Sequence, residues 1–152
     1  LFLRKKLQTL MTRKLFIFFH GYGANGSDIA PLIEYWRHHF SHVVFKYPDG
    51  PLVLDETHNM HAWFPIETMD VSVLLNAVQI AAPAIEDSIR KIQLDSNTTP
   101  EDTILGGFSQ GGMLALYLSL TAKILLAKAA LSYSGGLIAP QSYIQQKMTL
   151  YC

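Results

Sequence analysis

The stretch T-I-L-G-G-F-S-Q-G-G, residues 103–112, decides the fold. It contains the pattern G-x-S-x-G, with Ser109 flanked at two residues on either side by Gly107 and Gly111. A short apolar run precedes the pattern, and an apolar segment from Gln110 to about Ala122 follows it. A serine on such a turn adopts a strained backbone, and small neighbours let the strand and the helix approach closely. The stretch therefore predicts a strand, a sharp turn and a helix, with the Ser109 hydroxyl lifted above a sheet.

Outward from this turn, short apolar runs alternate with helical patterns. This alternation predicts an α/β fold with a mainly parallel sheet and helices on both faces. We expect residues 52–69 to be irregular and Pro83 to kink or divide the second helix. The expected strands cover residues 15–19, 43–45, 103–107 and 129–133, and the expected helices run from a cap at Asp28 to about His39, from a cap at Asp70 to about Ile92, and from Gln110 to about Ala122.

The sequence His20-Gly21-Tyr22-Gly23 follows the first apolar strand. In this architecture the loop after that strand supplies one half of an oxyanion hole, and the residue after the nucleophile supplies the other. We therefore assign the two donors to the backbone N–H groups of Tyr22 and Gln110. His20 lies on the wrong loop for a catalytic base, so we expect it to shape the turn by hydrogen bonding, with Gly21, Gly23, Gly107 and Gly111 also shaping the site.

Four segments together resemble the phospholipase/carboxylesterase family of serine α/β-hydrolases, which includes the acyl-protein thioesterases. They are H-G-Y-G-A-N-G with Asp28, M-H-A-W-F at residues 60–64, G-G-F-S-Q-G-G at 106–112 and L-S-Y-S-G-G at 131–136. The resemblance implies that Ser109 is the nucleophile and that Tyr22 and Gln110 hold the oxyanion. It also implies that Trp63 helps to wall the acyl site, although Trp63 and Phe64 are equally consistent with ordinary core aromatics.

The sequence departs from the family after the nucleophile. Members place an aspartate and a histidine of the triad beyond this region, in the order Ser, Asp, His, but here the last aspartate is Asp102 and the last histidine is His61. His38, His39 and His42 are typical of a solvated helix end. His58 and His61 are the alternatives for a relocated base or a metal pair, but a zinc site needs three or four ligands. We expect no cofactor and no metal.

Without the base, catalysis should be very weak. Loss of the triad histidine costs on the order of 10⁶ in turnover, while binding and the oxyanion hole retain about 10³–10⁴ over water. The leading hypothesis is a serine hydrolase of carboxylic esters or thioesters that works through an acyl-serine intermediate and is inactive or weakly active as this chain. The alternatives are a non-catalytic remnant or acyl-binding pseudoenzyme, and a metal-dependent hydrolase that uses His58 and His61.

The domain organisation expected from the sequence is simple. Residues 1–14 form an N-terminal extension, with either Leu1 or Met11 as the start, and residues 15–152 form the N-terminal and central part of one α/β-hydrolase domain whose C-terminal strands are missing. The strand at 129–133 should then be an exposed apolar edge. We therefore expect a truncated or split hydrolase that pairs with a complementing C-terminal fragment or self-associates through this edge.

The composition restricts the binding partners and the cellular location that we expect for this chain. The 152 residues carry 12 basic and 12 acidic side chains, which gives no reason to expect a nucleic-acid partner or an anionic membrane surface. No apolar run reaches the ~20 residues of a membrane span. The one cysteine, Cys152, allows no intrachain disulfide, so we expect a cytoplasmic protein. The substrate should be a small ester, a thioester or a lipid.

Overall fold

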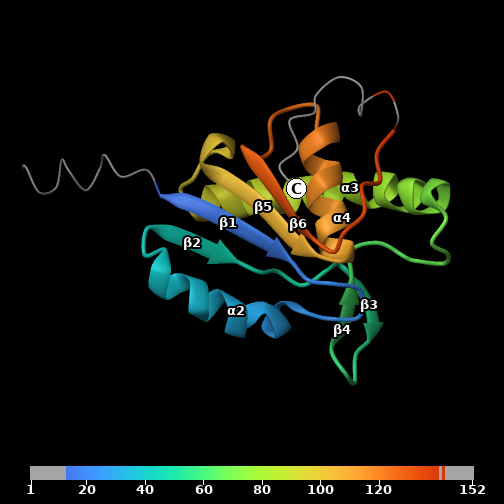
Figure 1. Cartoon of the computed structure of the whole chain (residues 1–152), viewed down its shortest axis with the longest axis horizontal. Coiled ribbons are helices and arrows are strands. Elements are labelled where there is room, and N and C mark those ends of the chain that lie inside the picture. Colours follow the sequence, from blue (N-terminus) through green and yellow to red (C-terminus); the bar gives the residue numbers. More distant parts are fainter. Residues whose placement is uncertain (1–12, 141, 143–152) are drawn as a thin grey trace, which may run out of the picture.

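A computed structural model describes residues 13–140 and 142. Its centre is a parallel four-stranded sheet in the order β2-β1-β5-β6 (Figure 1). The strands are β1 (Lys14–Phe19), β2 (Val43–Lys46), β5 (Thr103–Phe108) and β6 (Ala129–Tyr133). All four strands expected from the sequence are therefore confirmed, and β1 and β5, which flank the two glycine-rich loops, are neighbours in the centre of the sheet.

Helices cover both faces of this sheet, as predicted. The helices are α2 (Gly26–His39), α3 (Val71–Asp95) and α4 (Gln110–Thr121). The alternation along β1 separates the two faces: Leu15, Ile17 and Phe19 pack with the buried residues of α3 and α4, whereas Phe16 and Phe18 pack with α2. The described chain thus has the predicted α/β architecture, with α2 on one face of the sheet and α3 with α4 on the other.

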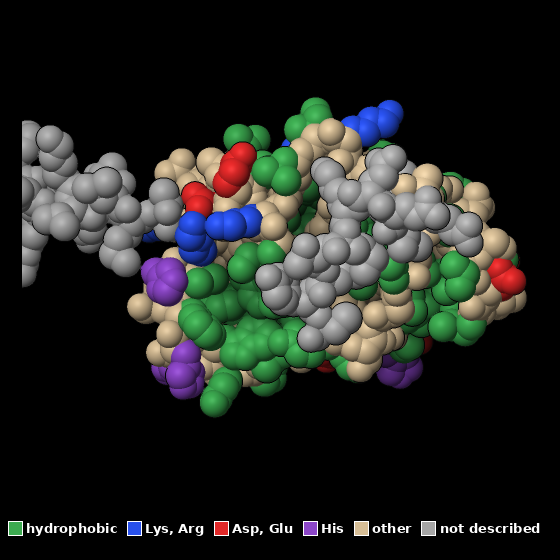
Figure 2. Space-filling model, turned by 45° about the horizontal axis from the view of Figure 1, so that its top comes forward, with side chains coloured by type: hydrophobic (Ala, Val, Ile, Leu, Met, Phe, Trp, Pro, Cys, Tyr) green, Lys and Arg blue, Asp and Glu red, His purple; other side chains and the backbone are tan. Residues whose placement is uncertain are grey.

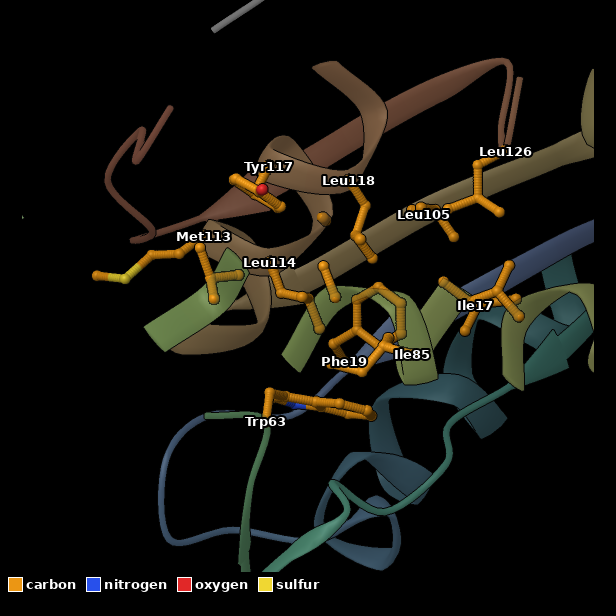
Figure 3. Packing of buried hydrophobic residues seen from close by; sticks show 14 of the residues in the cluster. Ile17, Phe19, Trp63, Ile85, Leu105, Met113, Leu114, Tyr117, Leu118 and Leu126 are labelled. Carbon is orange, nitrogen blue, oxygen red and sulfur yellow. The ribbon is translucent and has the colours of Figure 1, made fainter. Parts of the chain in front are cut away.

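The larger core lies between the sheet and the pair α3 and α4 (Figure 3). Leu105 of β5 and both Leu114 and Leu118 of α4 are completely buried. α4 is apolar nearly all round, which suits a helix enclosed by the sheet, by α3 and by the end of the described chain. The sheet and α4 therefore form the rigid base from which the turn at Ser109 projects.

The start of α2 differs from the prediction. Asn25, not Asp28, is the cap: its side-chain oxygen accepts from the backbone N–H of Asp28 at 3.3 Å. Asp28 is the third helical residue and returns the contact, since its carboxylate accepts from the Asn25 N–H at 3.1 Å. The prediction was wrong by three residues because the two side chains form a reciprocal capping box, in which the acidic member resembles a cap when read alone.

Residues 52–69 are also more regular than predicted. β3 (Leu52–Asp55) and β4 (Met60–Ala62) pair in antiparallel fashion and form a small second sheet below the main one (Figure 1). The register shifts between Val53 and Asp55, so the alternation of apolar residues that marks a hairpin is interrupted. This irregularity explains why the sequence pattern did not reveal the two strands.

Pro83 does not divide the long helix, contrary to one of the expected outcomes. α3 is a single helix of 25 residues with Pro83 inside it, and Asp70 caps it as predicted. Pro83 and Gln79, whose carbonyl loses its helical partner, both lie on the exposed side of α3. Water can therefore satisfy the free carbonyl while the buried face, which includes Val78 and Ile85, continues without a break.

One part of the sheet lacks a covering layer among the described residues. β6 pairs with β5 alone, which confirms its edge position within the described chain, and its Leu131 and Tyr133 side chains are 43% and 49% exposed. They lie beside an apolar hollow of about 680 Å³ on the face that carries α2. Figure 2 shows a broad apolar surface there. The lining includes Phe16, Trp36, Phe40, Ile104, Leu131 and Tyr133.

Within residues 13–140 and 142, no helix is both long and apolar enough to cross a bilayer. Cys152 and most of the expected N-terminal extension lie outside the described residues.

The exposed face predicts unequal effects of two leucine truncations on neighbouring strands. Leu105→Ala should lower the free energy of unfolding by about 2–5 kcal/mol, because Leu105 is fully buried. Leu131→Ala should change it by only about 0.5 kcal/mol or less, because Leu131 lies on the open face. Urea denaturation of both variants measures the difference. Equal losses would show that another layer covers Leu131.

Candidate active site

Ser109 lies on the turn between β5 and α4 in a strained conformation. Its φ is 52° and its ψ is −116°, a region that residues with side chains rarely occupy. Two backbone hydrogen bonds hold it there: the Ser109 N–H donates to the Tyr133 carbonyl at 2.8 Å, and the Ser109 carbonyl accepts from the Met113 N–H at 3.0 Å. The side chain is partly exposed, so the turn presents a hydroxyl at the carboxyl end of the sheet.

The flanking glycines leave no room for a side chain. A methyl carbon on Gly107 would lie 2.2 Å from the carbonyl carbon of Gly111, and one on Gly111 would lie 2.1 Å from the carbonyl oxygen of Phe19. These contacts join β5, α4 and β1 at backbone distance. The sharp turn at Ser109 thus depends on glycine at both positions.

The loop after β1 lies against this turn. A methyl carbon on Gly21 would be 3.7 Å from the Cβ of Ser109, so the loop after β1 and the turn at Ser109 are neighbours. Gly23 has a φ of 80°, which favours glycine, and its N–H donates to the His61 carbonyl at 2.8 Å. The structure therefore brings the 20–23 loop and the Ser109 turn together at the carboxyl end of the sheet.

Tyr22 and Gln110 lie in different surroundings at this end of the sheet. Tyr22 is 45% exposed on the loop, whereas Gln110 is the first residue of α4 and is completely buried. The free N–H groups at the start of α4 carry the partial positive charge of the helix, and this favours an anion beside the turn. A carbonyl oxygen that gains charge next to Ser109 would therefore be stabilised by the start of α4.

His20 is buried beneath the loop and makes two hydrogen bonds. Its Nδ1 donates to the Gly21 carbonyl at 2.8 Å, and its Nε2 accepts from the Gly50 N–H at 2.9 Å. This pattern requires the neutral imidazole with the proton on Nδ1. Burial lowers the pKa of His20 below its ordinary value, although the Gly21 carbonyl and the charge of Asp49 oppose the shift. His20 links the loop to the turn at Gly50.

Trp63 is a buried residue that underlies the same loop. It is 4% exposed, and its ring lies beside Phe19, with ring centroids 4.8 Å apart (Figure 3). Its indole N–H donates to the His20 carbonyl at 3.0 Å. Trp63 thus belongs to the core below the loop and also holds one of the loop's carbonyls.

Sequence reasoning missed the side chain of Gln110. Its Oε1 accepts from the Trp63 N–H at 3.0 Å, and its Nε2 donates to the Phe64 carbonyl at 2.6 Å. A polar side chain at the buried start of an apolar helix was the available signal, because such a group must find partners. Which partners it finds depends on tertiary structure, since they lie more than 40 residues away in the chain.

The two histidines that could have replaced the catalytic base, His58 and His61, have partners of their own. His58 Nδ1 lies 2.8 Å from a carboxylate oxygen of Asp55 in the exposed hairpin, and this contact lowers the pKa of Asp55. His61 Nδ1 donates to the Gly50 carbonyl at 2.9 Å, and its Nε2 lies 3.0 Å from the side-chain oxygen of Asn59. Both ring nitrogens of His61 are therefore engaged. Across the described part of the chain, no group of three or more His, Cys, Asp and Glu side chains is arranged to hold a metal.

Comparisons with known proteins agree with the geometry. Residues 8–151 match the family described as Phospholipase/Carboxylesterase. The chain is 36% identical over 120 residues to Acyl-protein thioesterase 1 of Saccharomyces cerevisiae, an alignment that covers 72% of this chain and 52% of the relative. It is 32% identical over 118 residues to Acyl-protein thioesterase 1 of Kluyveromyces lactis, covering 72% and 51%.

A solved structure shows the same fold. The crystal structure of esterase PE8 superimposes with a TM-score of 0.78 at 31% identity, covering 89% of this chain and 63% of that one. The chain spans about half the length of the curated relatives it matches.

The close packing at Gly111 predicts a steep cost for one methyl group. Gly111→Ala should lower the free energy of unfolding by about 1–3 kcal/mol or more, because the new carbon meets the Phe19 carbonyl. Gly136→Ala is the matched control, since nothing lies within 4 Å of its added carbon. Chemical denaturation of both variants decides the matter, and a stable Gly111→Ala protein would contradict the packing.

Because His20 is buried in its neutral form, we expect the folded chain to lose stability as the pH falls. Its pKa is lowered in the folded chain, so its contribution to stability is complete above the unfolded value of about 6.5 and is lost as pH falls below it. Denaturation between about pH 8 and pH 5 should show a steeper loss in the wild type than in His20→Gln. The exposed His42→Gln variant should keep the wild-type slope. Equal slopes in the wild type and His20→Gln would count against the assignment.

Proposed function

Because the chain belongs to the phospholipase/carboxylesterase family, we propose that it is the nucleophile-bearing part of a serine hydrolase that cleaves carboxylic esters or thioesters. The observation that carries the proposal is the strained Ser109, placed between a buried strand and a helix and lying beside Gly21. Such a turn costs about 1–3 kcal/mol of conformational energy and lifts one hydroxyl toward the two amide-bearing loops.

The proposed reaction has two steps. The Ser109 Oγ attacks the carbonyl carbon of the substrate, and the N–H groups of Tyr22 and Gln110 stabilise the negative oxygen. The C–O or C–S bond then breaks, an alcohol or thiol leaves with the proton that came from Ser109, and an acyl-serine remains. Water attacks the acyl-serine in the same way and releases the carboxylic acid. Each of the two donors contributes about 2.7–4 kcal/mol to transition-state stabilisation in such sites.

A base must take the Ser109 proton and pass it to the leaving group. After Ser109 the chain has neither an aspartate nor a histidine, and His61 has both ring nitrogens engaged. We propose that the acid and the base come from the part of the family fold that this chain does not match, since its relatives are about twice as long. The chain by itself would then be inactive or weakly active.

The open face is the proposed place for that complementing polypeptide. α2 covers β1 and β2, while the hollow extends across Ile104, Leu131 and Tyr133. Roughly a third of esterase PE8 has no counterpart in this chain, which covers 63% of it. A layer that covers the hollow and pairs with β6 would bury these side chains and satisfy the edge. Self-association of the chain through β6 is the competing outcome.

The remaining parts of the proposal concern the setting. We propose a small ester, thioester or lipid as substrate, because the similar proteins are an acyl-protein thioesterase and an esterase. We also propose a cytoplasmic location, since the single cysteine permits no intrachain disulfide.

The nucleophile is tested by a fluorophosphonate probe followed by intact-mass measurement. The wild-type chain, in isolation or in an extract of the cells that produce it, should gain one phosphonyl group, and Ser109→Ala should gain none. Ser134→Ala is the matched control, because Ser134 also has a positive φ, 55°, but lies outside the turn. Labelling only in the extract would show that the base comes from elsewhere. No labelling in either setting would favour the non-catalytic alternative.

A further inference from the structure

The two proposed oxyanion donors lie on separate segments of the chain. Tyr22 follows β1, whereas Gln110 begins α4, so their N–H groups are 88 residues apart in sequence. Donors of this kind must be held within about 0.5 Å of the productive geometry by packing and hydrogen bonds. Contacts outside the two donors must therefore fix the Tyr22 loop relative to the start of α4.

Gln110 is joined to the segment after β4 by both ends of its amide. Its Oε1 accepts from the Trp63 N–H at 3.0 Å and its Nε2 donates to the Phe64 carbonyl at 2.6 Å, and its side chain is completely buried. Only a group that accepts at one atom and donates at the other can satisfy both backbone groups. The amide therefore fixes residues 63 and 64 to the first residue of α4.

The same segment is joined to the Tyr22 loop on its other side. The Trp63 indole N–H donates to the His20 carbonyl at 3.0 Å. Further along, the Gly23 N–H donates to the His61 carbonyl at 2.8 Å, and the His61 N–H donates to the Ala24 carbonyl at 2.9 Å. These three bonds lie before and after Tyr22 in the chain, so they hold both ends of the loop that carries it.

We propose that residues 61–64 act as a spacer that sets the distance between the two amides, with the Gln110 side chain and the Trp63 indole as its positioning groups. This inference rests on the proposed function and extends it to two side chains that touch no reacting atom. The Gln110 and Trp63 side-chain bonds of the spacer are uncharged and buried, so each of these bonds is strong and its loss is costly. A change in the spacer should therefore alter the reactivity of Ser109 without altering Ser109 itself.

The first test needs no catalytic activity. Trp63→Phe keeps an aromatic ring but removes the bond to the His20 carbonyl. Trp36→Phe is the matched control, because Trp36 packs against Phe16 and Phe18 on the opposite face of the sheet. Hydrogen exchange followed by NMR in the 152-residue chain should show the Gly23 and His61 amides exchanging about tenfold faster in Trp63→Phe and unchanged in Trp36→Phe.

The Ser109 amide separates positioning from general destabilisation. It donates to the Tyr133 carbonyl at 2.8 Å and lies outside the spacer, so its exchange should keep the wild-type rate in Trp63→Phe. Equal acceleration of the Ser109, Gly23 and His61 amides would overturn the proposal, as would wild-type rates at all three.

The second test uses Gln110→Glu and a pH series. A buried carboxyl has a raised pKa, and its protonated form can still accept from the Trp63 N–H and donate to the Phe64 carbonyl. Fluorophosphonate labelling relative to wild type should be at least about tenfold slower near pH 8 and recover as pH falls toward about 5. Circular dichroism at each pH verifies that the variant is folded where rates are compared.

The two tests distinguish a failure of the spacer proposal from a failure of the proposed hydrolase function. A folded Gln110→Glu protein that labels at the wild-type rate at every pH would overturn the spacer while leaving Ser109 as the nucleophile. If the wild-type chain does not label at all, the proposed hydrolase activity fails for this chain, and the exchange measurement still decides whether the spacer holds the loop.

Discussion

The contact between the backbone of β1 and the start of α4 is the constraint on which the rest of the structure depends. Gly111 lies so close to the Phe19 carbonyl that a single carbon on it would overlap the strand, and Gly107 faces Gly111 across the turn with equally little space. With both helix and strand held at this distance, the chain between them has no relaxed path. Ser109 takes a positive φ as a result, and the hydroxyl emerges beside the loop that follows β1.

Hydrogen bonds between uncharged groups also hold the segments around the site together. His20, Trp63 and Gln110 join four separate segments of the chain through groups that carry no charge in the folded state. Ion pairs contribute little here: those between described side chains lie at the surface or, as with Lys14 and Asp102, at the opposite end of the sheet. A network of neutral groups suits a reaction whose charge appears only in the transition state.

The sequence was sufficient for the parts of the fold that repeat a local pattern. After its first residue, each of β1 and β5 is an apolar run, and the turn at Ser109 lies where the second run meets a helical pattern. The hairpin of β3 and β4 was missed because its register shifts near Asp55, and the cap of α2 was misplaced because Asn25 and Asp28 exchange bonds. The roles of the Gln110 and Trp63 side chains depend on partners that are distant in sequence, and no local pattern encodes these partners.

The strain at Ser109 also distinguishes the residues of the G-x-S-x-G pattern that the fold requires from the one that it does not. The close approach of this strand and this helix requires glycine at positions 107 and 111 whether or not the protein is an enzyme. These two glycines are therefore evidence for the fold and not for an activity. Serine at a φ of 52° has no such architectural reason, since glycine would adopt that conformation at lower cost and the Ser109 side chain makes no capping hydrogen bond to α4. Of the three residues that define the pattern, only the one in the middle bears on the proposed chemistry.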